Sequence, residues 1–285
     1  MLSRTQIRQF LAVVDSGSFT RAANALNIAQ PSLSGGIAEL ERQLGTRLFV
    51  RERRRISLTE AGNLLLPLAR SIEREFDQVA ARIGNRPVPR RPVRLGVLDT
   101  VSTGWIADAV RAYQGEDPLE LTEGNERELH SALGSGSIDL ALTILPRERR
   151  GVMEELLRDD YCLALPAGHS LAGRAVVEAS DVAGETMIAR RACEVLAETS
   201  RFFTERGVRP RFALRSANDD RALQLVAAGL GVTVAPRSLG RDGLAMVKLA
   251  DFNLARTLGL IFAEHWTPQA AAHPLVLALR AAVWI

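Results

Sequence analysis

Apolar residues at the start of the chain recur every three or four positions, which is the spacing of one buried helix face. The first such face is formed by Ile7, Phe10, Leu11 and Val14. Ser18 can cap a short second helix, and Pro31 suits the first turn of a third helix that ends at Gly45. Two short helices joined by a tight turn predict a helix-turn-helix motif, in which the later helix is the recognition helix.

A β-hairpin wing is predicted after this motif. Arg47–Arg51 and Ile56–Leu58 are short, partly apolar segments on either side of a charged turn. The turn carries the consecutive arginines Arg53, Arg54 and Arg55, and arginine at a wing tip can enter a narrow minor groove, where negative potential is concentrated. A charge run is often only a solvated turn, but behind a helix-turn-helix motif we favour DNA contact.

A long amphipathic helix is predicted next, from about Glu60 to Ile83, with Thr59 as its cap. Its apolar seam consists of Leu65, Leu68, Ile72, Phe76, Val79 and Ile83. The seam either packs on its own domain or pairs with another helix. Because a solitary long helix would expose it, we favour a dimer. The prolines of Asn85–Pro92 then predict an extended linker.

From Val93 onward, apolar strand-like segments alternate with helical spacing. Strands are predicted at Val93–Leu98, Leu119–Glu123 and Ile138–Ile144. Such alternation predicts a parallel sheet, and ligands of these sheets bind beyond the carboxyl ends of the strands. Those ends are the loops at residues 99–104 and 124–126, beside helix starts whose free N–H groups attract anions.

A second unit of the same kind follows. Its strands are predicted at Tyr161–Pro166, Glu185–Ala189, Phe212–Arg215 and Gly231–Pro236, with helices between them. Leu258–Phe262 then leads back to the first unit, and a last helix is expected at Leu275–Val283. The sequence therefore predicts an α/β fold of two units behind the helical first third.

Charge is divided unevenly along the chain. Residues 1–90 hold 14 Arg against 8 Asp and Glu, although the whole chain carries only +3. A basic third joined to an acidic remainder is typical of a nucleic-acid-binding module attached to another domain. No apolar run reaches the roughly 18 residues of a membrane span, and no signal-peptide core is present. With only 2 Cys, we expect a cytoplasmic protein without a membrane partner.

The motifs of the first third resemble the DNA-binding domain of LysR-type transcriptional regulators. The matching stretches are Ser18–Ala23, Gln30–Ser34, Leu40–Gly45, Arg47–Arg51 and Leu58–Gly62. The resemblance implies that the start of the recognition helix meets the major groove of double-stranded DNA and that a wing arginine enters the minor groove. The residues expected to contact DNA are Ser18, Thr20, Gln30, Pro31, Ser32, Ser34, Arg42, Arg51, Arg53, Arg54 and Arg55.

One departure from the family pattern lies at Gly35–Gly36, where a basic or long polar residue is usual. Two glycines inside a helix cost roughly 1 kcal/mol each relative to alanine. They also remove a side chain from the DNA face. We therefore expect weaker binding or a larger share of contacts from Arg42 and the wing.

The remainder resembles the effector domain of the same family, two α/β subdomains around a cleft, similar to periplasmic binding proteins. Its markers are Gly136–Ala141, Leu165–Ala172 and Leu225–Val232. The implied architecture is a winged helix-turn-helix at 1–58, a linker (dimerisation) helix and hinge at 59–90, effector subdomain 1 at 91–161 and 266–285, and effector subdomain 2 at 162–265. The family also implies self-association as a dimer or a tetramer.

In such proteins a small effector binds in the cleft and changes the geometry of the oligomer on DNA. The resemblance places in the lining Thr100, Ser102, Thr103, Asn125, Arg190, Arg191, Cys193 and Asn218. Hydroxyls, helix starts and arginine favour a small carboxylate or a similar anion. Each hydroxyl could equally serve only to cap a loop.

Cys193 supports an alternative, a thiol-based regulator that senses oxidants or electrophiles. It follows Arg190-Arg191-Ala192 and precedes a helix, and both features lower the pKa of a thiol, whereas Glu194 opposes them. The peroxide-sensing branch of the family uses a cysteine pair. Here the second cysteine, Cys162, lies in a predicted buried strand, which does not support that mechanism.

An enzyme and a DNA-architectural protein are two further functional classes. No metal-spaced cluster, P-loop or nucleophile elbow is present, so we expect no enzyme activity, cofactor or metal. A DNA-architectural protein without an effector is the other class. A cleft filled by the protein's own side chains would support it.

Overall fold

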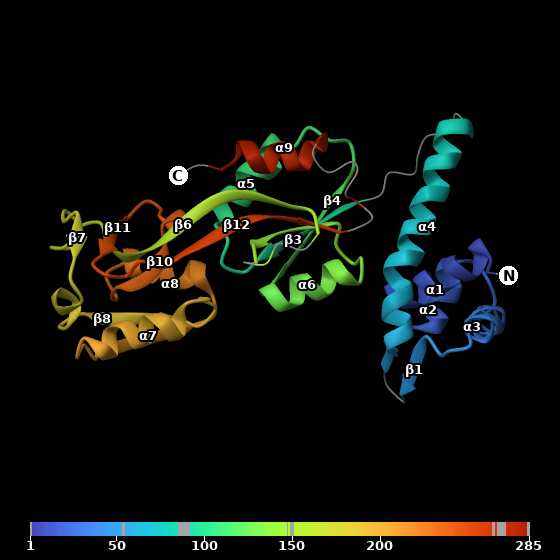
Figure 1. Cartoon of the computed structure of the whole chain (residues 1–285), viewed down its shortest axis with the longest axis horizontal. Helices are drawn as coiled ribbons and strands as arrows, with labels where there is room; N and C mark the ends of the chain where they lie inside the picture. The colour runs from blue at the N-terminus through green and yellow to red at the C-terminus, as the bar shows by residue number, and fades with distance from the viewer. Residues whose placement is uncertain are drawn as a thin grey trace. The chain divides into compact units, whose positions relative to one another are not determined.

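The computed structural model describes residues 2–52, 55–84, 92–146, 148, 151–263, 266 and 272–283. The chain divides into two compact units (Figure 1). The first holds residues 1–93 with the short segments 117–119 and 131–139, and the second holds 94–116, 120–130 and 140–285. Among the described helices, none is both long and apolar enough to cross a membrane.

The first unit begins with a helix-turn-helix motif, as predicted. Its three helices are α1 (Arg4–Ser16), α2 (Phe19–Ala25) and α3 (Gln30–Leu44). Ser3 and Ser18 cap α1 and α2 by accepting backbone hydrogen bonds. Gly17 and Gly45 end α1 and α3 with φ of +61° and +69°, a conformation that glycine adopts without strain.

The apolar faces of these helices meet in one core. Phe10, Leu33 and Ile37 are fully buried there. The ring of Phe10 packs 5.3 Å from that of Phe49 in β1 (Phe49–Glu52), which pairs antiparallel with β2 (Arg55–Leu58) to form the predicted wing. The core therefore fixes both the recognition helix and the base of the wing. Arg53 and Arg54 at its tip, and the side chains of Arg51 and Arg55, lie outside the described part.

Helix α4 (Glu60–Gly84) closes the first unit. The hydroxyl of Thr59 accepts a hydrogen bond of 3.0 Å from the backbone of Gly62, which confirms the predicted cap. Leu66 and Ala69 are buried against the core of the unit. Farther along α4, the guanidinium of Arg4 binds Glu73 at 2.9 Å, so α1 and α4 are joined by packing and by an ion pair.

The opposite face of α4 carries the apolar seam. The exposed side chains are Leu64, Leu68, Ile72, Phe76 and Val79, with exposed fractions from 38% to 67%. Leu65, which the sequence placed in the seam, packs on the core instead, because it lies on the same side of the helix as Leu66 and Ala69. The side chain of Ile83 and the predicted linker at residues 85–91 lie outside the described part.

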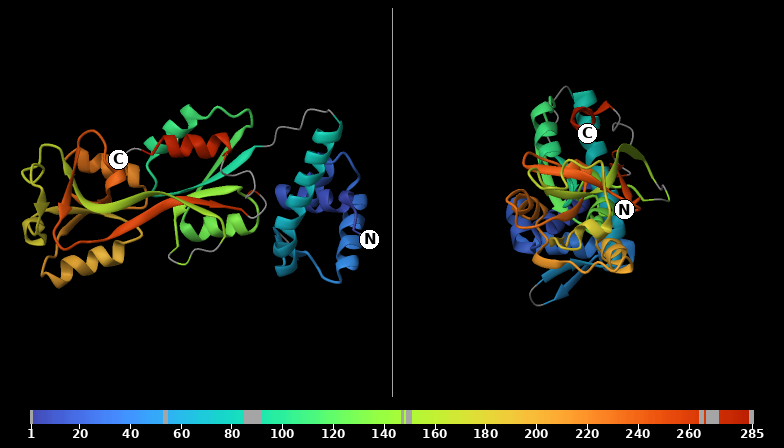
Figure 2. Two further views of the ribbon diagram at one scale, coloured as in Figure 1. Left: turned by 45° about the horizontal axis from the view of Figure 1, so that its top comes forward. Right: turned by 90° about the vertical axis from the view of Figure 1, so that its left-hand side faces the viewer.

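The second unit is built on one 8-stranded sheet and a separate two-stranded sheet. Subdomain 1 contains β3 (Val93–Leu98), α5 (Thr103–Ala112), β4 (Leu119–Gly124), α6 (Glu126–Gly134), β5 (Leu140–Ile144) and α9 (Pro274–Ala281). Strands β3 and β5 are parallel, as predicted. Helices α5 and α9 lie side by side (Figure 2), and the indole N–H of Trp105 donates to the carbonyl of Leu279.

Two long strands join the subdomains (Figure 1). They are β6 (Met153–Pro166) and β12 (Ala255–Phe262), which pair antiparallel. The sequence predicted only the second half of β6, because its first half is mostly charged and holds only the short apolar pair Leu156-Leu157. Strand β12 is also antiparallel to β5, so the sheet is mixed and not purely parallel as we expected.

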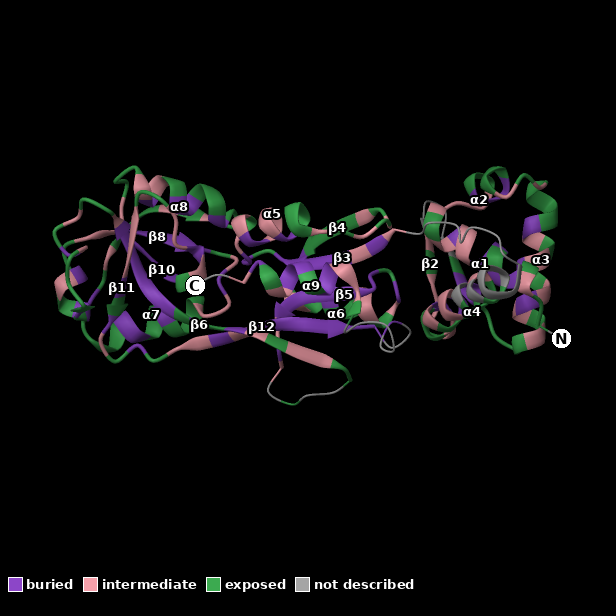
Figure 3. Ribbon diagram, turned by 90° about the horizontal axis from the view of Figure 1, so that it is seen from above, coloured by how far each residue is buried: buried purple, intermediate pink, exposed green. Residues whose placement is uncertain are grey.

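Subdomain 2 places helices on both faces of its strands. Its elements are β7 (Val176–Val177), η1 (Ala179–Val182), β8 (Thr186–Arg190), α7 (Leu196–Glu205), β9 (Arg211–Ser216), α8 (Asp219–Ala227), β10 (Thr233–Pro236), η2 (Arg237–Leu239) and β11 (Leu244–Leu249). Met187 of β8 packs in one cluster with Phe202 and Phe203 of α7. Its neighbour Ile188 packs with Val226 of α8. Successive strand residues face opposite sides, so the central strands are buried (Figure 3).

Candidate functional site

The DNA-facing candidates surround the start of α3. Gln30, Pro31 and Ser32 are exposed, and the side-chain amide of Gln30 donates to the hydroxyl of Ser34 at 2.9 Å. Thr20 on α2 is also exposed, whereas the hydroxyl of Ser18 caps that helix. These polar groups stand at the leading end of the recognition helix, where such a helix contacts base edges.

Arg42 lies in the last turn of the same helix. Its guanidinium binds the carboxylate of Glu39 at 2.5 Å, and 72% of its side chain remains exposed. Hydrogen bonds from Arg42 and Gln43 lower the pKa of Glu39 to about 2. Arg42 can therefore still meet a phosphate, but only in competition with a neighbouring carboxylate.

The two glycines of α3 differ in their surroundings. A Cβ placed on Gly35 would meet nothing within 4 Å, whereas one placed on Gly36 would lie 1.9 Å from the side-chain oxygen of Gln9. Gln9 belongs to α1 and is buried. Gly36 thus permits the close approach of α1 and α3, and Gly35 leaves the exposed helix surface bare.

A buried polar network joins the two subdomains around Arg256 of β12. Its guanidinium binds Asp159 of β6 at 3.0 Å and Glu194 at 2.8 Å. It also donates to the hydroxyl of Thr100 at 2.8 Å and to its carbonyl at 3.0 Å. Arg256, Asp159 and Thr100 are each at most 5% exposed. Thr100 follows β3 in subdomain 1 and Glu194 precedes α7 in subdomain 2, so this network spans the junction.

The carboxylate of Glu194 is the centre of the network. One oxygen meets Arg256 and the hydroxyl of Thr100, and the other accepts from the phenol of Tyr161 at 2.9 Å. Burial opposes ionisation of Glu194, but Arg256 and the hydrogen bonds outweigh it and lower its pKa. Burial, and then the charge of Glu194, raise the pKa of Tyr161, which therefore stays a donor.

Two more carboxylates lie near this junction, Glu126, which interacts with Glu194 and Arg256, and Asp99, the chain neighbour of Thr100. Burial raises the pKa of Glu126 at the start of α6, and the charge of Glu194 adds to the effect. Burial, followed by neighbouring carboxylates that include Asp219, raises the pKa of Asp99. The surroundings of the junction are therefore rich in negative charge, which limits the anionic charge that it can accept.

The predicted effector residues fall into three groups. Thr100 belongs to the junction network. Asn125 and Asn218 are exposed and accept backbone hydrogen bonds of 3.1 and 2.7 Å at the starts of α6 and α8. Ser102 and Thr103 lie at the start of α5, and the hydroxyl of Ser102 makes no capping hydrogen bond. The asparagine side chains thus already have backbone partners.

Arg190, Arg191 and Cys193 form the third group. Arg190 is fully buried and pairs with Asp219 at 3.0 Å, while its remaining nitrogen donates to the carbonyl of Val234 at 3.2 Å. Its charge is therefore neutralised inside subdomain 2. Arg191 is exposed, and its backbone N–H donates to the carbonyl of Ser216 at 2.7 Å.

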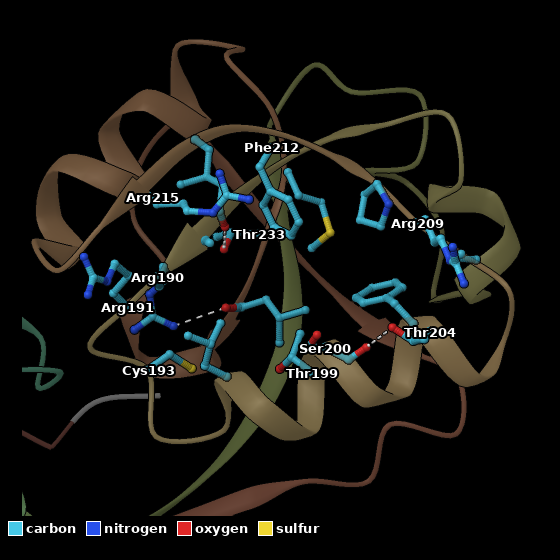
Figure 4. Close-up of a pocket in the computed structure, with 18 residues that line it drawn as sticks. Arg190, Arg191, Cys193, Thr199, Ser200, Thr204, Arg209, Phe212, Arg215 and Thr233 are labelled. Atoms are coloured by element: carbon cyan, nitrogen blue, oxygen red, sulfur yellow. Dashed lines mark hydrogen bonds between the residues drawn. The ribbon is translucent and has the colours of Figure 1, made fainter.

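These three residues line a pocket of about 460 Å³ in subdomain 2, between α7 and strands β8 and β9 (Figure 4). Apolar side chains of β8, α7 and the segment before β9 form its walls. Arg191 and Arg209 lie at opposite ends of the view, and Arg215 lies above. The hydroxyl of Thr199, also in the lining, is buried and has no hydrogen-bond partner in the described part of the chain.

Both cysteines are buried and are not joined in a disulfide. Cys193 is 8% exposed, and burial raises the pKa of its thiol despite the nearby charge of Arg190. Burial likewise raises the pKa of Cys162 in β6. Of the opposing influences that the sequence context offered for Cys193, the arginine does not prevail, because burial outweighs it and raises the pKa of the thiol.

The residues that the sequence reasoning missed are Asp159, Tyr161, Glu194 and Arg256. Each is an ordinary polar residue in the sequence, and Arg256 lies 156 positions from its partner Thr100. One available signal was the pair of opposite charges, Asp159 and Arg256, placed next to apolar strand segments. No metal-binding group of His, Cys, Asp and Glu occurs among the described residues.

A helix-turn-helix unit with a wing, followed by an α/β unit of two joined subdomains, defines a DNA-binding regulator with a sensor domain. The family model for bacterial regulatory helix-turn-helix proteins of the lysR family matches residues 5–63, and that for the LysR substrate binding domain matches residues 86–284. The chain therefore belongs to the LysR family of transcriptional regulators.

Similar proteins include regulators of the peroxide response. The chain is 34% identical over 268 residues to the "Probable hydrogen peroxide-inducible genes activator" of Mycobacterium avium, covering 90% of this chain and 86% of the relative. It is 27% identical to the "DNA-binding transcriptional dual regulator OxyR" of Escherichia coli K12, covering 96% and 94%.

Solved structures of similar proteins share the fold. A full-length OxyR variant from Pseudomonas aeruginosa matches with a TM-score of 0.75 at 19% identity, covering 98% of this chain and 95% of that one. An OxyR mutant from Corynebacterium glutamicum with H2O2 bound matches with a TM-score of 0.52 at 25% identity, covering 98% and 92%.

Proposed function

We propose that this LysR-type regulator is controlled by a small anionic effector at the junction of its two subdomains. The observation that carries the proposal is the set of donors around Glu194. Arg256, Thr100 and Tyr161 together hold one carboxylate. A free carboxylate would meet the same donors if Glu194 moved away, and charge-assisted hydrogen bonds of this kind are among the stronger ones.

The negative charge of the carboxylates near the junction favours an effector that carries a single negative charge. Asp99 and Glu126 have raised pKa values because they are partly buried near other carboxylates. A second negative charge on the effector would add to this repulsion. The same donors suit one carboxylate, which agrees with the carboxylate that the sequence favoured.

DNA recognition is assigned in the same proposal to the exposed start of α3 and to the arginines of the wing. Gln30, Pro31 and Ser32 present polar and apolar groups at the end of the helix that enters a major groove. Because Gly35 leaves the next helix surface bare, we expect the wing to supply much of the affinity.

The test is a thermal-shift screen of small organic acids on the full-length protein, followed by gel shifts on a bound genomic site. We expect monocarboxylates to stabilise the protein and change its DNA affinity. Thr100→Val should abolish both effects, while Thr122→Val, at an exposed position of β4, should retain them. Hits confined to neutral compounds would contradict the proposal.

The junction as it stands is satisfied by the protein's own side chains. A regulator without an effector would have the same hydrogen-bonded junction. The screen therefore discriminates an effector-controlled regulator from an effector-independent one. If no small molecule stabilises the protein while DNA binding is normal, the effector-independent regulator is the correct assignment.

A second candidate is a thiol-based sensor that uses Cys193. Two observations favour it: relatives of 34% and 33% identity are named hydrogen peroxide-inducible genes activators, and Cys193 is the chain neighbour of Glu194 in the junction. The raised pKa of the thiol opposes it, because the thiolate is the reactive species.

Peroxide treatment of the full-length protein tests this candidate. Dimedone trapping with mass spectrometry should detect a sulfenic acid at Cys193 and a change in DNA affinity that Cys193→Ser removes. Cys162→Ser is the matched control and should leave the response intact. An unmodified Cys193 at millimolar peroxide would exclude the thiol mechanism.

A further inference from the structure

We infer that the pocket between α7 and strands β8 and β9 is a second ligand site, which takes an amphipathic organic anion. The ligand class is a single carboxylate or sulfonate on an apolar body. The site lies inside subdomain 2 and does not depend on the effector proposed for the junction. Shape, lining and charge each support this assignment.

The size and walls of the pocket suit the apolar body of such a ligand. Its volume of about 460 Å³ is in the usual range for small-molecule sites. Met187, Phe203 and Val208 form buried walls. Leu196 and Phe212 are 36% and 45% exposed, so apolar surface continues to the mouth. Covering this exposed apolar surface with a ligand removes it from water, which favours binding.

The charge of the pocket suits the anionic group. Arg191, Arg209 and Arg215 line it and are exposed, and none has an ion pair in the described part of the chain. No described lining residue is an Asp or a Glu. The guanidinium of Arg215 lies 4.8 Å from the ring centre of Phe212, which holds this cation beside the apolar mouth.

Arg190 does not contribute to this charge, because Asp219 neutralises it. The unpaired cations therefore belong to the rim, and the apolar groups to the interior (Figure 4). The hydroxyl of Thr199 is a polar atom in the wall that has no hydrogen-bond partner among the described residues. This distribution fits an apolar body inside and an anionic head at the rim.

A small amphipathic anion fits better than a second copy of this chain. The arginines are uncompensated, and a partner chain would have to present acidic residues on an apolar projection. The acidic residues of α7 and α8 that the structure describes lie on solvated helix surfaces or in ion pairs. The occupant is therefore assigned as a free organic anion.

Calorimetric titration of the full-length protein with decanoate tests the site, with 1-decanol as the uncharged control. We expect saturable binding of one decanoate per chain, at least tenfold tighter than decanol. Arg215→Ala should weaken decanoate several-fold and leave decanol unchanged. Arg201→Ala, an exposed arginine of α7 outside the lining, is the matched control and should bind normally. Equal affinity for the acid and the alcohol would overturn the anionic assignment.

A steric variant and a chemical probe locate the ligand. Ser200 is exposed and lines the pocket, so Ser200→Trp should fill it and abolish binding without lowering the melting temperature. In a Cys162→Ser background, decanoate should slow alkylation of Cys193 several-fold, since that thiol lies in the lining. Normal binding by Ser200→Trp, or unchanged alkylation, would overturn the site. A variant that instead changes the oligomer mass would identify the pocket as a contact between chains.

Discussion

At the residue scale, Glu194 places a negative charge at the junction where we propose that the effector binds. Its carboxylate is shared by donors from both subdomains, Thr100 on one side and Tyr161 on the strand that joins them. Burying an unpaired carboxylate would be costly, so Arg256 and these hydroxyls must compensate it. Loss of any one donor leaves a charge without its full set of partners.

The lowered pKa of Glu194 gives this ion pair a defined pH dependence. Its ionised form stabilises the fold above the ordinary value of 4.5, and this contribution is lost as pH falls through the lower folded value. Glu194→Gln should therefore lower the melting temperature at pH 7, and the difference from wild type should shrink below about pH 4.5. Melting curves of both proteins from about pH 3.5 to 8 measure this. A difference that stays constant over that range would remove the ion pair as its cause.

The glycine pair of α3 allows a matched comparison of single residues. Gly35→Ala should stabilise α3 locally by about 1 kcal/mol, because alanine restricts the unfolded chain and meets nothing at this position. Gly36→Ala forces Gln9 to move and should give less stabilisation or a loss. Hydrogen–deuterium exchange of α3 peptides in the full-length protein reads out both. Equal protection in the two variants would show that Gln9 does not constrain this helix.

At the element scale, helix periodicity and caps were predictable, because they depend on residues within a few positions of each other. Ser18, Thr59 and Gly45 marked helix ends correctly. The first half of β6 was missed because it is mostly charged, and only its pairing with β12 makes it a strand. The junction was missed for the same reason: Asp159 and Arg256 are 97 positions apart and meet only when β6 and β12 pair.

The exposed seam of α4 predicts how copies of the chain associate. Leu68 is 61% exposed at the middle of this apolar face, which a second helix can cover. Leu68→Glu should reduce the solution mass toward that of a monomer, because it places charge inside the helix pair. Light scattering after gel filtration measures the mass. Asn63→Glu adds the same charge on an exposed position outside the seam and should leave the mass unchanged; if both variants behave alike, the seam is not the interface.

At the scale of the whole molecule, the positive charge of the DNA-binding third and the negative charge of the effector domain nearly cancel. The first 90 residues carry 14 Arg, whereas the chain as a whole has only +3. Phosphate contacts should therefore come from the first unit, and the charge of the second unit should affect DNA little. Within the DNA-binding unit, the wing has the densest positive charge.

The salt dependence of DNA affinity tests whether the phosphate contacts come from the first unit. DNA affinity should fall steeply with salt, because each phosphate contact releases condensed counterions. Arg53→Ala with Arg54→Ala should lower affinity and reduce the salt slope by about two, roughly one for each lost cation. Arg201→Ala with Arg211→Ala removes two exposed cations from the second unit and should leave the slope unchanged. Gel shifts at several salt concentrations, with circular dichroism to verify folding, give the slopes. A wild-type DNA affinity that does not change with salt would contradict phosphate-driven binding. An unchanged salt slope in the wing double variant would assign the affinity to α3, despite its two glycines.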